Sequence, residues 1–343
     1  MAKTRNLTCF LFFLLLNGCA FFQISSDIEL AKSREIIAYS ISEENCVKTF
    51  FNVPIKVDKC SRGYFHLLEH LLLRELNPNK FPGWILARTT SDRMVFQFIH
   101  FQNRTDEVFK LFSLILNSNL IKLSSVEKEL KILQYEKMLF KTSSLPDFSN
   151  FEKLMKNLEK LHATYFVNKP VIIIQNHKKN TILEEKKFKT SENSIRTKAW
   201  QKLCDKIKFN SENLNSIKHS EDEICYIMLG FNTKSLYFTN LASKFLSKYN
   251  DISLLSVYIS HLLYEQFILT GETYEATSYF DSEKSILGFW TFGKISEIEE
   301  KETKIKKILN QIENINFPIK EYIKEKFELF KSTKIITKHE NDN

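Results

Sequence analysis

The chain has 343 residues, of which 43% are hydrophobic, and its seven glycines and six prolines exclude a low-complexity or collagen-like protein. The formal net charge of +8 comes mostly from scattered lysines. Because no dense block of basic residues is interleaved with aromatic residues, the sequence argues against nucleic acid as a partner. A chain of this length can bury a sizeable core, and the length predicts two domains.

The N-terminus has the pattern of an export signal. Lys3 and Arg5 precede an apolar run at residues 9–16 that is too short to span a bilayer comfortably. The following Leu16-Asn17-Gly18-Cys19 resembles a bacterial lipobox. This resemblance implies a signal peptide at residues 1–18, lipidation of Cys19, and an exported lipoprotein anchored to a membrane of the cell envelope. An ordinary cleaved secretory signal and an uncleaved anchor are the alternatives.

Residues 35–178 follow a polar tether at residues 19–34 and form the first predicted half. Runs rich in β-branched and aromatic residues predict strands at residues 35–41, 49–57, 95–99 and 171–175. Apolar residues at helical spacing predict helices over residues 107–120, 126–140 and 151–166, and one further helix is expected around residue 66. This order of strands and helices is typical of an α+β fold.

Residues 179–220 form a predicted linker region, because their first part is rich in lysine, asparagine, glutamate and serine. Residues 221–335 are the second predicted half, and residues 336–343 are a polar tail. The second half has predicted strands at residues 224–231, 271–280 and 285–292, and predicted helices over residues 238–248, 254–268 and 301–330.

The first half carries the sequence His66-Leu67-Leu68-Glu69-His70. On a helix, residues four apart share one face, so both imidazoles can reach one metal ion. Neutral imidazole suits zinc, and a carboxylate beside a zinc-bound water can take its proton. The order H-x-x-E-H is the inverzincin signature, which predicts His66 and His70 as ligands and Glu69 as general base. The alternative is a helix face that carries two histidines by chance.

The stretch from Gly63 to Leu73 resembles the motif of the pitrilysin/insulinase family of zinc peptidases. In that family a later helix supplies the third ligand, with a second glutamate seven residues before it. Glu136 and Glu129 match this pair, and seven residues place both carboxylates on one helix face. The resemblance implies a zinc site of His66, His70 and Glu136, with Glu129 in support. It also implies two related α/β-layered halves, of which the second is degenerate or trimmed.

Two further segments resemble the family's substrate-binding elements. Residues 86–96 resemble its edge strand, with Ala87 and Thr89 in matching positions and Leu86 in place of the usual asparagine. Tyr274 matches a substrate-binding tyrosine, although packing is the more common role of a tyrosine in a strand. The arginine that accompanies this tyrosine is replaced by Phe267. A second family subunit that supplies this arginine is therefore a predicted partner.

The predicted function is that of a zinc-dependent endopeptidase that cleaves short unfolded peptides, with the water activated by zinc and Glu69. The main alternative is a non-catalytic pitrilysin-like subunit or scaffold lipoprotein, which the replacements at Leu86 and Phe267 favour. A purely structural zinc site is a third possibility, but such sites usually close with four protein ligands.

Overall fold

The computed structural model describes residues 36–43, 45–58, 61–117, 121–140, 144–167, 172–175, 195–209, 213–313 and 319–333. The predicted signal peptide, the lipidation site Cys19 and the tether lie outside the described residues, as do the polar tail and the first part of the predicted linker. Within the described part of the chain, no helix has both the length and the apolar character that crossing a bilayer requires.

The first half is built on a five-stranded sheet in the order β3-β4-β2-β1-β5. β1 to β4 pair in antiparallel fashion. Along β2, buried residues alternate with half-buried ones, as expected for a strand with one face in the core. On the buried face, the ring of Phe51 stacks on that of Phe112 in α4. β5 pairs in parallel with β1 and forms the other edge of the sheet. The elements of this half are β1 (Ile36–Ser42), β2 (Val47–Pro54), α3 (Arg62–Leu76), β3 (Trp84–Thr89), β4 (Arg93–His100), α4 (Thr105–Leu114), α5 (Leu123–Leu139), α6 (Phe151–His162) and β5 (Ile172–Gln175).

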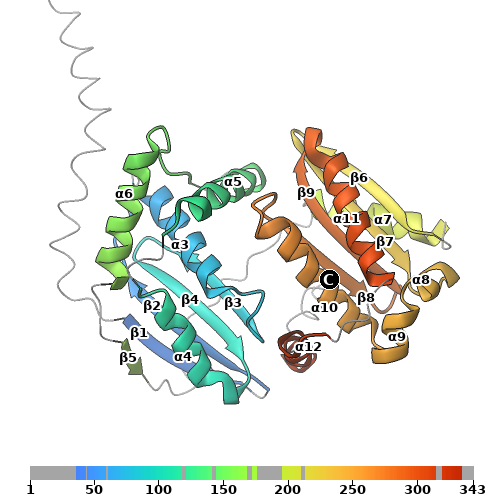
Figure 1. Cartoon of the computed structure of the whole chain (residues 1–343), viewed down its shortest axis with the longest axis horizontal. Helices are drawn as coiled ribbons and strands as arrows, with labels where there is room; N and C mark the ends of the chain where they lie inside the picture. The colour runs from blue at the N-terminus through green and yellow to red at the C-terminus, as the bar shows by residue number, and fades with distance from the viewer. Residues whose placement is uncertain are drawn as a thin grey trace, which may run out of the picture.

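The second half is built on a four-stranded antiparallel sheet in the order β6-β7-β9-β8, and it lies beside the first half (Figure 1). A short π-helical segment, η4 (Tyr264–Ile268), continues α10. The other elements are α7 (Ile195–Phe209), β6 (Asn215–Glu221), β7 (Ile224–Asn232), α8 (Leu236–Leu241), α9 (Ser243–Tyr249), α10 (Ile252–Leu263), β8 (Ala276–Asp281), β9 (Ile286–Lys294), α11 (Ile298–Glu313) and α12 (Glu321–Thr333). The described part of the chain is thus an α+β protein with two sheets.

The two halves share one topology. Read from the opposite edge, the second sheet has the order β8-β9-β7-β6, which corresponds strand for strand to β3-β4-β2-β1. β3 begins eight residues after α3 ends, and β8 begins eight residues after η4 ends. When the two halves are aligned by this spacing, Tyr258, His261 and Leu262 occupy the positions equivalent to His66, Glu69 and His70. The second half therefore repeats the fold of the first without repeating its His66, Glu69 and His70.

Two predicted elements are divided in the structure. The stretch at residues 86–96 is not one strand, because a turn closed by a hydrogen bond from the Thr90 amide to the Arg93 carbonyl separates β3 from β4. The helix expected over residues 301–330 is two helices, α11 and α12, and Pro318 lies between them. Proline removes a helical hydrogen bond and disfavours helical geometry in the residue before it.

The C-terminal helix α12 ties the second half to the first. Arg104 of the first half forms an ion pair with Glu325, and Lys326 donates a hydrogen bond of 3.0 Å to the Pro78 carbonyl oxygen. Leu329 is fully buried in a small cluster with Cys46 and Ile99 of the first sheet. The last helix in sequence thus packs across both halves and fixes one relative to the other.

Candidate metal centre

Helix α3 is fixed at both ends. Just before its first turn, the Asp58 amide donates a hydrogen bond to the Ser61 hydroxyl and the Ser61 amide donates one to the Asp58 carboxylate. Asn77 ends the helix in the left-handed conformation. A side chain at Gly63 would meet the backbone of Leu145 at 2.3 Å, so only glycine allows that segment to lie against the helix.

The imidazoles of His66 and His70 converge on the carboxylate of Glu136 from α5. Each Nε2 atom lies 3.3 Å from Glu136 Oε2, and the candidate ligand atoms of the three residues all lie within 4.8 Å of one another. Two ligands that are each about 2.0–2.1 Å from a tetrahedral zinc ion lie about 3.3 Å apart, so the observed spacing fits zinc. Two imidazoles and one carboxylate also form a donor set that catalytic zinc sites use.

Glu129 lies behind His70, on the same buried face of α5 as Glu136. Its Oε2 atom accepts a hydrogen bond of 3.1 Å from His70 Nδ1, and its other oxygen is paired with Arg74. A carboxylate on the far ring nitrogen fixes the orientation of a metal-binding histidine and raises its basicity. Arg74 also donates hydrogen bonds to the carbonyl oxygens of Leu269 (2.9 Å) and Ile268 (3.2 Å), which links this outer layer to the second half.

The carboxylates around His70 shape the electrostatics of the site. Burial alone would lower the pKa of His70, but hydrogen bonds to Glu129 and Glu136 and the nearby negative charges raise it to about 10. Burial opposes ionisation of Glu136, yet hydrogen bonds to His66 and His70 hold its pKa well below the usual value. The site therefore concentrates negative charge around two nitrogen donors, an arrangement that a divalent cation would neutralise.

Glu69 and Tyr274 complete the surroundings of the three donors. Glu69 is buried on α3, one residue before His70. Tyr274 comes from the second half, and its ring centroid lies 6.5 Å from that of His70 and 6.0 Å from that of Phe140. Burial, followed by the charges of Glu136, Glu275 and Glu69, raises the pKa of the Tyr274 phenol. The phenol therefore stays protonated and can donate a hydrogen bond near the site.

The other two residues predicted to bind substrate lie on one edge of the first sheet. Ala87 and Thr89 lie on β3, which is an edge strand of the first sheet, and the buried Thr89 hydroxyl has no hydrogen-bond partner among the described residues. Phe267 is fully buried in the core of the second half, so no cationic group occupies that position. Arg196, which the sequence patterns did not indicate, donates a hydrogen bond of 2.7 Å to Glu275, the residue after Tyr274.

A large cavity lies between the two halves and reaches His70, one of the three candidate ligands. It has a volume of about 860 Å³. His70 and Glu129 contribute to its wall from the first half, and the whole length of β8 lines it from the second half. A cavity of this size, lined by apolar groups with a few converging polar groups, is typical of a binding site.

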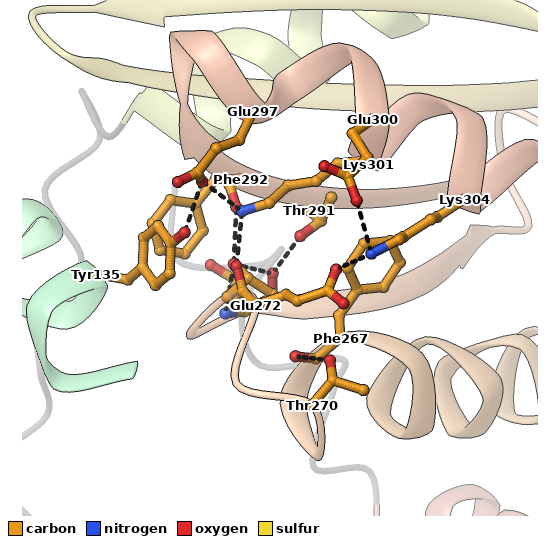
Figure 2. A network of polar contacts seen from close by, with 12 residues as sticks. Tyr135, Phe267, Thr270, Glu272, Thr291, Phe292, Glu297, Glu300, Lys301 and Lys304 are labelled. Carbon is orange, nitrogen blue, oxygen red and sulfur yellow. Dashed lines mark hydrogen bonds and ion pairs between the residues drawn. The ribbon is translucent and has the colours of Figure 1, made fainter. Parts of the chain in front are cut away.

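A network of polar contacts holds α5, which carries Glu136, against the second half (Figure 2). The Tyr135 hydroxyl donates a hydrogen bond of 2.6 Å to Glu297, whose carboxylate lies 3.2 Å from the buried ammonium of Lys301. Lys301 also donates hydrogen bonds to the carbonyl oxygens of Glu272 (2.7 Å) and Phe292 (3.1 Å) and lies over the Tyr135 ring. One cation thus fixes both α5 and the loop that leads to Tyr274.

Replacing Lys301 with methionine is expected to lower the free energy of unfolding by about 3–5 kcal/mol, because it leaves buried acceptors without their donor. The control is Lys304→Met on the same helix. Lys304 is one third exposed and pairs with Glu272 and Glu300 near the surface, so its loss should cost no more than about 1 kcal/mol. Urea unfolding followed by circular dichroism measures both, and equal losses would contradict the assigned role of Lys301.

Comparison with known proteins yields similarities in structure only. No family profile matches the chain, and no curated protein matches it. The similar solved structures include proteases. One is a protease from Helicobacter pylori, with 13% identity, a TM-score of 0.31, and coverage of 87% of this chain and 84% of that chain. Another is the periplasmic protease PqqL from Escherichia coli, with 10% identity, a TM-score of 0.25, and coverage of 80% of this chain and 34% of that chain.

Proposed function

We propose that the chain is a zinc-dependent peptidase of the pitrilysin/insulinase type. The observation that carries this proposal is the convergence of His66, His70 and Glu136, with the buried carboxylate of Glu69 beside them. Three protein ligands leave one position of a tetrahedral site open, which distinguishes catalytic zinc sites from structural ones. When bound, zinc would supply a Lewis acid and a water molecule of lowered pKa.

Each residue of the site has a chemical role in this proposal. Glu69 is not one of the three ligands, so its carboxylate is free to accept a proton from the water and to pass it to the leaving amine. Glu129 holds His70 in the tautomer whose Nε2 faces the ligand position. The protonated Tyr274 phenol, close to His70, can donate a hydrogen bond to the substrate carbonyl oxygen.

The proposed substrate is a short, unfolded peptide. β3 is an edge strand, and an extended peptide can add to such an edge through main-chain hydrogen bonds. The cavity between the halves gives room for a chain segment but not for a folded domain. The experiment that tests this function is turnover of an unfolded peptide by the full chain before and after removal of the metal.

A second candidate is a zinc-bearing subunit that acts together with a related chain. It is favoured by the burial of Phe267 in the core, because this side chain cannot form charge-assisted hydrogen bonds to a peptide. Arg196 offers an alternative cation within the same chain. Membrane anchoring through Cys19 would place either form of the protein at the cell envelope. If the isolated chain and the complex cleaved peptide equally fast, the subunit proposal would be wrong.

A further inference from the structure

Lys326 of α12 lines the cavity between the two halves, the same cavity to whose wall His70 and Glu129 contribute. Its ammonium group donates a hydrogen bond of 3.0 Å to the Pro78 carbonyl oxygen. No carboxylate lies within ion-pair distance of it among the described residues. Trp84, Ile323 and Phe330 also line this cavity and add apolar surface to it.

The other lysine and arginine in the cavity wall each have an anionic partner. Arg74 is paired with Glu129, and Lys331 lies 2.9 Å from Glu328. Among the acidic residues of the wall, Asp281 lies 3.3 Å from Lys284. Lys326 is therefore the one lysine or arginine among the described lining residues that lacks an anionic partner.

Lys326 is half-buried, and a cation that has lost part of its hydration without gaining an anionic partner is costly to the folded protein. Burial lowers the pKa of Lys326 to about 8, so the group remains mostly protonated at neutral pH. Buried charges in proteins are normally paired, because an unpaired charge loses its hydration without compensation. A cation that faces a cavity without a partner is therefore well placed to receive an anion from the ligand that enters the cavity.

We propose that Lys326 binds a carboxylate of the peptide substrate and so selects peptides that carry a negative charge away from the bond to be cleaved. The inference rests on the proposed function, because the same cavity reaches the candidate metal centre. A peptide offers two sources of a carboxylate: its C-terminus and the side chain of an aspartate or glutamate. The amide of Asn79, also in the cavity wall, adds a polar neighbour but no charge.

The test is equilibrium binding of matched peptides to the full chain carrying Glu69→Gln, which is designed to prevent turnover. One pair of peptides differs only in a free or amidated C-terminus, and a second, amidated pair differs only in an internal Glu or Gln. Calorimetry, supported by the fluorescence of Trp84, measures each dissociation constant. For at least one pair, we expect the charged peptide to bind about tenfold more tightly or better, as a charge-assisted hydrogen bond provides. The pair that shows this preference identifies the source of the carboxylate.

The same titrations in a Lys326→Met background should show no preference for the charged peptide. Lys331→Met is the matched control, because Lys331 lies on the same helix and lines the same cavity but is already paired, so the preference should persist. Lys326 is half-buried and has no anionic partner among the described residues, so Lys326→Met is not expected to unfold the chain, and thermal unfolding checks this.

In the chain that retains Lys326, equal affinities within both peptide pairs would overturn the inference. A preference for the charged peptide that survives Lys326→Met would also overturn it. Neither result depends on catalysis. A chain that cleaves peptides without any charge preference would retain the proposed function and lose this inference. A chain that shows the preference but has neither zinc nor turnover would lose the proposed function and retain the carboxylate site.

Discussion

Replacing Glu69 with glutamine is expected to leave the metal bound and to lower kcat by about 10²- to 10⁴-fold, the contribution of a general base. The reason is geometric. The three ligand atoms belong to His66, His70 and Glu136, and the carboxylate of Glu69 is not among them. Glutamine has nearly the same shape but cannot accept the proton.

The measurement combines metal analysis with steady-state cleavage of an unfolded peptide. Glu75→Gln is a suitable control, since this half-buried residue lies on the same helix beyond the metal-binding turn. It should leave both metal content and turnover unchanged. If Glu69→Gln released the metal, or if it cleaved peptide at the wild-type rate, then Glu69 would not be the general base.

Removal of a ligand has a different expected signature from removal of the base. His66→Ala and Glu136→Gln should each weaken zinc binding by more than about 100-fold and abolish turnover, because the described residues offer three ligands at this site and each variant removes one of them. Glu129→Gln should weaken binding by about 10- to 100-fold, as is usual for a residue that orients a ligand. Glu127→Gln, on the exposed face of the same helix, should have no effect.

Competition with a chromophoric chelator measures these affinities directly. The predicted order is wild type and Glu127→Gln first, then Glu129→Gln, and then the two ligand variants. A Glu136→Gln protein that bound zinc as tightly as wild type would show that the third ligand lies elsewhere.

Local sequence patterns predicted the part of the site that depends on helical periodicity. His66 and His70 are four residues apart and Glu129 and Glu136 are seven apart, and each pair lies on one face of its helix. The structure brings these two helices together so that the predicted ligand group forms. The resemblance to a known motif linked the two pairs, since nothing in their local sequence indicates that α3 and α5 are neighbours.

Contacts between distant segments were beyond the reach of the same reasoning. Lys301 looked like one of many charges on a solvated helix, yet it is almost fully buried and bonded to carbonyl groups of two other segments, at Glu272 and Phe292. Lys326 was likewise unremarkable in sequence, because its position in a cavity depends on how α12 packs across the halves. Such roles arise from tertiary packing, which overrides the local expectation that lysine is exposed.

Elements of low hydrophobicity were also missed. α7 and β6 lie within residues 195–221, where the periodic pattern of apolar residues was too weak to predict them. β6 is an edge strand, and only one of its seven residues is buried, so it needs few apolar side chains. The shared topology of the two halves appears only once this strand is included, since β6 is the counterpart of β1.

The measurement that tests the central proposal most directly is peptide cleavage by the purified full chain before and after zinc is removed with a chelator. The chain as purified should hold about one zinc ion and cleave an unfolded peptide. The metal-free chain should be inactive, and one equivalent of zinc should restore the activity in wild type but not in His66→Ala. Cleavage that persists in the fully metal-free chain would contradict the account, as would a zinc-loaded wild-type chain that cleaves no unfolded peptide.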